Sequence, residues 1–409
     1  MKPRVRLARA PSAVWRRLLA ALALGATLFW APAALAYPWF IRDGYTHCAQ
    51  CHADPSGSGL LTPYGRAQGE LLLRTRYPFE KPAEEAGRVA DFLFGIPTPD
   101  WLMLGGSVRN GYLAYRIPGS GGTPATTVTQ FLWMQEDLHG QVQLGRVRLN
   151  ASLGFLPDAL YSGPADLTSW SKDNIVMRDA FVGVDLDEDR EVLIRAGRIN
   201  LPYGLRGNEH TMFIHTALRD DTNTDQQYGF AIAYNHGGWR TEGMAYVGNL
   251  QIQPSVYWEH GVTGYVEYAL ADKLTIGASA LAAESAVDLF TELSLIRQGY
   301  GAFSRWSPFR SLVLMAEVDG LVESMNHQAF KPGYAGMLQA DFMPFQGLHV
   351  IATAEAQDDP TQAPSGSVQG AWLGVDWFFA PHADIRVDGI VHVGDQPSQS
   401  LLGQLHLYL

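Results

Sequence analysis

From about residue 101 to its end, the chain consists of segments of about ten residues in which apolar and polar residues alternate. Val182, Val184 and Leu186 share one face of such a segment, and the stretch 192–196 repeats the pattern after a charged turn. A period of two residues is typical of a β-strand that is buried on one face. Because the pattern continues to the C-terminus, the sequence predicts a mainly β fold with many strands.

The number and spacing of these segments restrict the fold further. We count about sixteen strands, starting near residues 101, 128, 141, 175, 190, 226, 238, 261, 272, 293, 309, 333, 347, 368, 382 and 400. Tight turns near 139, 187, 236, 271, 307, 344 and 380 separate longer loops near 117–127, 157–174, 202–225, 249–260, 323–332 and 357–367. Alternating short turns and long loops around an even number of strands are typical of antiparallel outer-membrane β-barrels. We therefore expect a barrel over residues 101–409; a soluble β-sandwich or propeller is the alternative, although neither requires this alternation.

The second face of the predicted strands is polar. It carries Arg148, Asn150, Ser152, Arg240, Glu242, Glu267, Glu317, Asp319, Gln339, Asp341, Asp384, Arg386 and Asp388. In a barrel of roughly sixteen strands these side chains line a lumen wide enough for water. Aromatic residues such as Tyr112, Trp239, Trp377 and Phe379 suit the two interfacial girdles of such a barrel.

Residues 1–36 have the three parts of a secretory signal peptide. Six basic residues and no acidic residue lie within 1–17, an apolar run extends from Leu18 to Trp30, and Ala34 and Ala36 provide a cleavage site. The apolar run is shorter than the roughly 20 residues that cross a bilayer as a helix, which disfavours an uncleaved anchor. We expect the mature chain to begin at Tyr37 and to reach the bacterial outer membrane.

Removal of this leader makes the chain more acidic. The whole chain has a net charge of −11, and the mature chain keeps 24 basic and 41 acidic residues, a net charge of −17. Nucleic-acid binding needs a basic surface, so we expect no nucleic-acid partner. Lipid of the outer membrane is the first expected partner.

Both cysteines of the chain lie in one motif, Cys48-Ala-Gln-Cys51-His52. C-x-x-C-H is the attachment motif of c-type haem, in which both sulfurs form thioethers and the histidine binds the iron. A disulfide is the alternative in an oxidising compartment, but it gives no role to His52. The motif therefore predicts one covalent haem c with His52 as its proximal iron ligand.

The segment that carries the motif, residues 37–100, is too short to build a large apolar core of its own. Helices are expected from about Gly65 to Arg76 and from about Pro82 to Phe94. Because one haem below the barrel would not bridge a hydrocarbon core about 30 Å thick, we expect this cytochrome segment to enter the lumen as a plug. Arg42 or Arg66 would then pair with the haem propionates.

The segments 37–42 and 61–66, on either side of the motif, resemble the corresponding flanks in fused monohaem cytochrome c–porins of bacterial outer membranes, which include iron oxidases. The resemblance implies electron transfer across the outer membrane through haem c on Cys48, Cys51 and His52. It also implies a periplasmic electron carrier and an extracellular redox partner or metal ion, with Fe(II) oxidation as one outcome. The stretch 197–204 is in addition similar to a strand-to-loop stretch of some substrate-selective porins. One departure is the C-terminal Leu409, where such barrels usually end on an aromatic residue.

The sequence leaves the sixth iron ligand open, because 37–102 contains no methionine. Met103 is our first candidate, since it is nearest in sequence and is in phase with the inward-facing Ser107 and Arg109. Other candidates are Met244, Met315, Met337, His210, Met212 and His215. The alternating Asp221, Asn223 and Asp225 resemble the start of a calcium loop, but Gln226 stands where that loop needs glycine.

Two functions are compatible with these features. In the first, the protein is an electron conduit between a partner outside the cell and a periplasmic carrier. In the second, it is a solute-diffusion porin whose haem-bearing segment acts as a plug or a redox sensor. The first accounts for both parts of the chain, whereas the second leaves the haem incidental.

Overall fold

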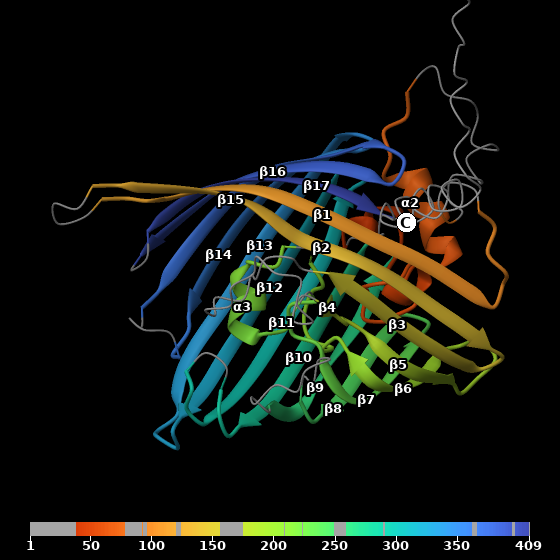
Figure 1. The fold of residues 1–409 in the computed structure, drawn as a ribbon, viewed down its shortest axis with the longest axis horizontal. Helices are drawn as coiled ribbons and strands as arrows, with labels where there is room; N and C mark the ends of the chain where they lie inside the picture. Colours follow the sequence, from red (N-terminus) through yellow and green to blue (C-terminus); the bar gives the residue numbers. More distant parts are fainter. Residues whose placement is uncertain are drawn as a thin grey trace, which may run out of the picture.

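The computed structural model describes residues 38–77, 92 and 96–408, apart from 120–123, 156–174, 208, 223, 249–258, 289–290, 362–365 and 395–396. Most of these residues form one antiparallel sheet that curls into a barrel (Figure 1). Its strands are β1 (Leu102–Ile117), β2 (Thr126–Leu144), β3 (Val147–Phe155), β4 (Ile175–Val176), β5 (Ala180–Asp185), β6 (Val192–Ile199), β7 (Gln227–His236), β8 (Trp239–Tyr246), β9 (Glu259–Ala271), β10 (Leu274–Ser285), β11 (Leu295–Phe309), β12 (Leu312–Met325), β13 (Lys331–Phe345), β14 (Leu348–Asp358), β15 (Val368–Ala380), β16 (Ala383–Gly394) and β17 (Ser398–Tyr408).

The barrel has sixteen strand positions, as the sequence predicts, because β4 and β5 together occupy one of them. Both pair with β3, β4 near Phe155 and β5 between Val147 and Ala151. The strand β1 pairs with β17 from Ser107↔Tyr408 to Arg116↔Gln399, which closes the sheet on itself. Closure gives each of the sixteen strand positions a hydrogen-bonded neighbour on both sides, so the barrel has no edge position.

The predicted alternation of short turns and long loops is confirmed, although one turn is misplaced and the connection between β10 and β11 was not predicted. The turn expected near residue 139 lies at 145–146, because His139 and Gly140 are still within β2 and pair with β1. Gly145 has a φ of +63°, a conformation that glycine adopts at little cost, and the chain reverses there. The third strand therefore starts at Val147 and not near 141.

The two faces of the wall differ as the alternation predicts. Outward-facing residues such as Val182, Leu338 and Trp239 are exposed on the side where lipid contacts the barrel. The inward-facing polar residues predicted from the sequence are buried or nearly so, Glu317 and Asp341 among them. Among the residues that the structure describes, no helix has the length and apolar character needed to cross a membrane.

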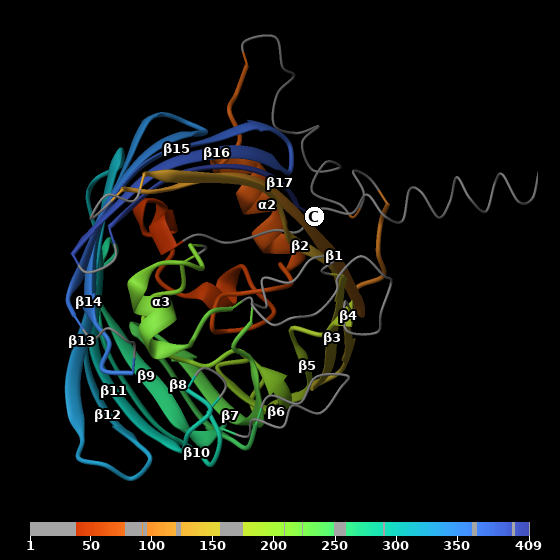
Figure 2. The same ribbon diagram turned by 60° about the vertical axis from the view of Figure 1, so that its left-hand side comes forward.

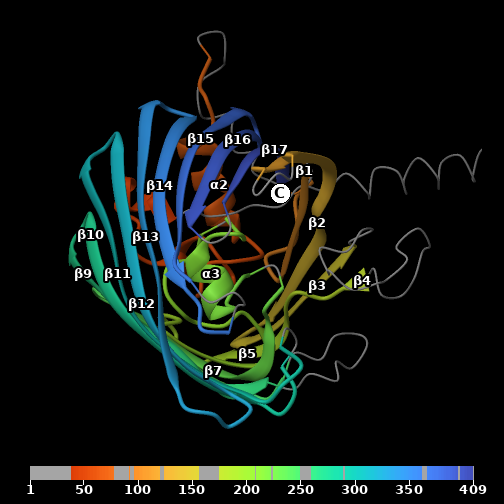
Figure 3. The same ribbon diagram turned by 90° about the vertical axis from the view of Figure 1, so that its left-hand side faces the viewer.

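Residues 38–77, here called the N-terminal segment, lie within the ring of strands (Figures 2 and 3). They contain the short 3-10 helices η1 (Pro38–Asp43) and η2 (Cys48–Gln50) and the helix α2 (Pro63–Leu72). Thr62 caps α2, since its hydroxyl oxygen accepts a hydrogen bond from Gly65 N at 3.0 Å. The helix expected over 65–76 is thus present but ends at Leu72, whereas the helix expected over 82–94 and the leader 1–36 lie outside the described residues.

The N-terminal segment is held against the inner wall by polar and aromatic contacts. Arg42 Nη2 lies 2.5 Å from Asp341 Oδ2 of β13, and both side chains are buried. The rings of Trp39 and His349 stack with their centroids 4.7 Å apart. At the other end of the segment, Thr75 N donates to Phe378 O of β15 at 2.9 Å.

The lumen is also filled by residues 200–226, the loop between β6 and β7, here called the inner loop. It contains the helix α3 (Phe213–Leu218), which lies beside the N-terminal segment inside the ring (Figure 3). Leu201, Tyr203 and Met212 of this loop are fully buried and belong to the same apolar cluster as Trp39 and Cys51. The inside of the barrel is therefore a packed core as far as the described residues show.

Replacing Asp341 with Ala should weaken the docking of the N-terminal segment. The variant leaves the Arg42 guanidinium buried without its ion-pair partner, and breaking a buried ion pair in this way costs about 3–5 kcal/mol. We expect residues 38–77 of the detergent-solubilised variant to become sensitive to protease at a lower urea concentration than in the wild type.

The control for this experiment is Glu188→Ala. Glu188 pairs with Arg146 at 3.4 Å on the surface, where the two side chains are 92% and 53% exposed. Exposed pairs contribute little to stability, so its protease sensitivity should match the wild type. Equal sensitivity of both variants would contradict the docking role of Asp341.

Candidate functional site

The two cysteines and the histidine of the C-x-x-C-H motif lie on one turn of the backbone. Cys48 O accepts hydrogen bonds from Cys51 N at 3.0 Å and from His52 N at 2.9 Å. An isolated antiparallel β-bridge joins His52 to Leu61, and next to it Ala53 N donates a hydrogen bond to Leu60 O at 2.9 Å. The motif is thus a compact unit that presents three side chains from five residues.

This unit lies inside the barrel close to a short turn, since His47 Nε2 lies 3.1 Å from the carbonyl oxygen of Trp239, the first residue of β8. Cys51 and His52 are 4% and 2% exposed, whereas Cys48 is half-buried. Both sulfurs are free of disulfide bonds. Burial, with a smaller contribution from Cys48, raises the pKa of the Cys51 thiol to about 12. The two cysteines are therefore held on one turn as separate sulfurs.

Two glycines allow the chain to pack closely around the motif. A Cβ at Gly65, in the first turn of α2, would lie 2.2 Å from Cys51 O, so only glycine lets the helix rest on the motif backbone. A Cβ at Gly57 would lie 2.9 Å from Cys48 Sγ, and Gly57 also has a φ of +101°. The loop that follows the motif therefore folds back over Cys48.

A row of arginines on the barrel wall holds the segment around the motif. Arg240 Nη1 of β8 lies 2.8 Å from Cys48 Sγ, and Arg305 Nη2 of β11 donates to Thr46 O at 2.8 Å. Both arginines also pair with Glu267, at 3.2 Å and 2.6 Å respectively. Because these guanidinium groups are buried and paired, they can hold the motif in place without leaving an uncompensated charge.

A second group of wall contacts fixes the residues after the motif. Arg195 Nη1 of β6 pairs with Asp54 Oδ1 at 2.7 Å, two residues beyond His52. Asn200, at the start of the inner loop, donates from Nδ2 to Asp54 Oδ2 at 3.4 Å. The motif is thus held from both sides by charged groups of the wall.

These residues are compatible with a covalent haem c. Two unpaired sulfurs and an imidazole share one turn, and apolar residues such as Trp39 and Leu61 belong to the same core as Cys51. Arg42 pairs with Asp341, and Arg66 is buried. Haem attachment, the role of His52 and a contact of Arg42 or Arg66 with haem propionates stay predictions.

The candidates for the sixth iron ligand occupy different parts of the lumen. Met103 lies on the inward face of β1, opposite the buried Gln141, and its role as a distal ligand stays a prediction. Met244 is buried on β8. His210 already uses both ring nitrogens, with Nδ1 2.7 Å from Asp221 Oδ1 and Nε2 2.8 Å from Arg109 Nη1.

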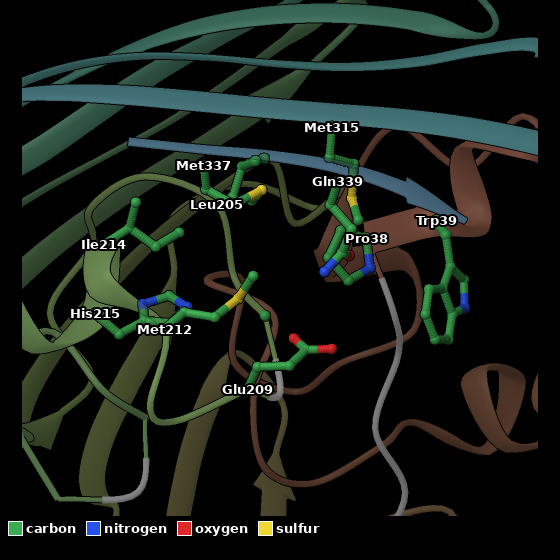
Figure 4. Close-up of a pocket in the computed structure, with 11 residues that line it drawn as sticks. Pro38, Trp39, Leu205, Glu209, Met212, Ile214, His215, Met315, Met337 and Gln339 are labelled. Atoms are coloured by element: carbon green, nitrogen blue, oxygen red, sulfur yellow. The ribbon is translucent and has the colours of Figure 1, made fainter. Parts of the chain in front are cut away.

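The four remaining candidates line one small cavity of about 20 Å³ (Figure 4). It lies between the N-terminal segment, the inner loop and the strands β12 and β13. Its lining includes Met212, His215, Met315, Met337, Glu209 and Trp39. Sequence phase alone placed Met315 and Met337 in the lumen, but it gave no reason to group them with the loop.

The stretch that resembles the start of a calcium loop forms hydrogen bonds within itself. Thr224 Oγ1 donates to Asp221 Oδ2 at 3.2 Å and to Asp225 Oδ1 at 3.3 Å, and Asp221 N donates to Asp225 Oδ2 at 3.1 Å. These carboxylates thus order their own turn; Asn223 lies outside the described residues. No group of three or more His, Cys, Asp or Glu side chains in the described part of the chain could hold a metal ion.

The inner loop is the part of the site that the sequence analysis missed. It was expected only as a long loop over 202–225, yet it folds inward and buries Leu201, Tyr203, Leu205, Ile214 and Leu218. A signal was present, since so many large apolar residues are unusual in a loop exposed to water. Its inward fold brings the loop into contact with the wall, for example through Leu205 N, which donates to Glu317 Oε2 at 2.7 Å.

Comparison with known proteins supports the fold. No protein-family model and no curated protein matches the chain. Among solved structures, an anion-selective porin from Comamonas acidovorans has a TM-score of 0.53 at 12% identity over 75% of this chain and 99% of that chain. OmpT of Vibrio cholerae has a TM-score of 0.55 at 10% identity, over 77% of this chain and 99% of that chain. The outer membrane channel DcaP of Acinetobacter baumannii has a TM-score of 0.52 at 12% identity, over 75% of this chain and 97% of that chain. Identities this low show the fold alone: the chain has the sixteen-stranded fold of porins of the bacterial outer membrane.

Replacing Gly57 with Ala should disturb the motif more than Gly44→Ala does. Both glycines have positive φ, +101° and +87°, so alanine is strained at either position by about 1–2 kcal/mol. In addition, the new methyl group at 57 would press on Cys48 Sγ, whereas a Cβ at 44 has no atom within 4 Å. The urea midpoint for proteolysis of residues 38–77 should fall further for Gly57→Ala, and equal midpoints would refute the close packing on Cys48.

Proposed function

We propose that the protein is a haem c electron-transfer protein of the outer membrane. It would move electrons between an extracellular donor or acceptor, such as Fe(II), and a periplasmic carrier. The proposal rests on one observation above all: the C-x-x-C-H turn is buried inside a membrane barrel whose lumen is packed with protein. A C-x-x-C-H motif that reacted only with partners at the protein surface would not need to be buried inside the barrel.

The packed lumen favours electron passage over solute passage. The N-terminal segment contacts β13, β14 and β15 of the wall. The inner loop lies beside it inside the barrel, where Trp39 and Met212 line the same cavity. In the proposed function these elements would hold solutes back, whereas an electron can tunnel through packed protein. Since the hydrocarbon core is about 30 Å thick, a haem held within the barrel would lie nearer to the outer surface than one held below it.

The residues have separate parts in this function. Cys48 and Cys51 would hold the haem through thioethers, and His52 would bind its iron. A haem bound there supplies one-electron oxidation and reduction. Arg240, Arg305 and Arg195 keep the motif in register with the wall, and the surrounding apolar core excludes water.

A solute-diffusion porin with a haem-bearing plug or a redox-sensing segment is the second candidate. The similarity in fold to an anion-selective porin and to the DcaP channel favours it. In that function, the N-terminal segment would have to leave or rearrange before a solute crosses. The two candidates therefore differ in whether transport requires movement of residues 38–77.

The first test concerns the covalent haem. The mature protein should keep its haem through denaturing gel electrophoresis and stain for haem peroxidase activity, because thioether bonds survive denaturation. The double variant Cys48→Ala/Cys51→Ala should lose the stain, while Met134→Leu, a change far from the motif in sequence, should keep it. A stain that persists without the two sulfurs would rule out haem c.

The second test separates the two candidate functions. Liposomes that contain the protein should let external Fe(II) reduce an enclosed ferricyanide acceptor while they retain a small enclosed sugar. The double cysteine variant should lose the reduction and still retain the sugar. Leakage of the sugar without electron passage would favour the porin function and contradict the conduit.

A further inference from the structure

We propose that the cavity in Figure 4 is a binding site for a soft monovalent metal ion of the Cu⁺ class. The donors are three thioether sulfurs and one imidazole nitrogen, from Met212, Met315, Met337 and His215. The site lies where the N-terminal segment, the inner loop and the wall meet. The proposal goes beyond the electron-transfer function and does not depend on haem attachment.

The two wall methionines are placed together by the strand register. Met315 of β12 is opposite Gln339 of β13, and Met337 of β13 is opposite Glu317 of β12. They are therefore diagonal neighbours on the inward face, close enough for long side chains to converge. Both are buried and line the cavity, and Met212 enters it from the inner loop, as Figure 4 shows.

His215 is oriented like a metal-binding histidine. Its Nδ1 lies 2.9 Å from Asp220 Oδ1, which fixes the ring and leaves Nε2 as the available nitrogen. The side chain is 4% exposed, and Nε2 has no hydrogen-bond partner among the described residues although it is buried. A carboxylate that holds the far nitrogen of an imidazole is the usual support of a histidine ligand.

Gly207 keeps the space in front of this nitrogen open. A Cβ at residue 207 would lie 3.4 Å from His215 Nε2 and 3.0 Å from Glu209 Oε2. Gly207 is not among the glycines with a positive φ, so its backbone does not require glycine. The small residue is therefore explained by the volume that it leaves beside Nε2.

The donor set selects the class of ion. Thioether sulfur is a soft ligand that favours Cu⁺ over Mg²⁺ or Ca²⁺, which need oxygen. The absence of a group of three His, Cys, Asp or Glu side chains in the described part of the chain argues against a Zn²⁺ site of the ordinary kind. Asp220 behind His215 and the nearby Glu209 add negative charge, although Glu209 also pairs with Arg386.

The test is a titration of the full-length, haem-bearing protein in detergent. Cu⁺, kept reduced by ascorbate without oxygen, competes between the protein and a chromogenic Cu⁺ chelator, and Ag⁺ serves as a redox-inert probe in calorimetry. We expect one ion per chain. His215→Ala and the volume-conserving Met315→Leu and Met337→Leu should each weaken binding at least tenfold, and Asp220→Asn about 10–100-fold.

The control is Met134→Leu, which replaces a buried methionine of β2 outside the cavity and should leave the affinity unchanged. Repeating the titration on Cys48→Ala/Cys51→Ala separates this proposal from the haem, since Cu⁺ binding should persist there. Failure to bind either ion at one per chain, or equal binding by wild type and the Met315→Leu/Met337→Leu variant, would overturn the site. A change in the haem absorption spectrum of metal-free His215→Ala would also overturn it, because the imidazole would then belong to the haem iron.

Discussion

Within a bilayer, every backbone N–H and C=O group must find its hydrogen-bond partner in the protein, because the hydrocarbon core holds no water. The pairing of β1 with β17 meets this requirement by leaving no strand without a neighbour. Once the ring is closed, each strand has one face toward lipid and one toward the lumen. The alternation of apolar and polar residues in the sequence follows directly from this division.

Closure also creates a second constraint, because the inward face carries charges that must be compensated. On the wall, Arg148 Nε donates a hydrogen bond to Asp185 Oδ2 at 3.0 Å. The Glu267 carboxylate forms ion pairs with both Arg240 and Arg305. The N-terminal segment enters this network through Asp54 and Arg42, which pair with Arg195 and Asp341. The polar lumen thus provides specific partners for the segment and does not merely leave room for it.

The sequence was sufficient for features that depend on local pattern, and insufficient for those that depend on distant pairs. Strand period, turn spacing and the inward phase of Met315 could be predicted because each follows from neighbouring residues. The turn at Gly145 was misplaced because His139-Gly140 is an equally good turn sequence locally, and only pairing with β1 shows that β2 continues. The contact of Arg42 with Asp341 joins residues 299 positions apart, which no local pattern specifies. The inward fold of the inner loop could be predicted only in part. Its apolar residues can be read from the sequence, but the surface against which they pack cannot.

The character of the lumen core bears on how the protein can work. Trp39 and Ile41 of the N-terminal segment, Tyr203 of the inner loop and Met315 of the wall belong to one apolar cluster. Burial of apolar surface contributes about 25 cal/mol per Å², so separating these elements would expose a large part of the stabilising surface to water. Moving the N-terminal segment and the inner loop away from the wall would therefore cost free energy. The same packing gives the C-x-x-C-H turn and the methionine-lined cavity fixed surroundings inside the barrel.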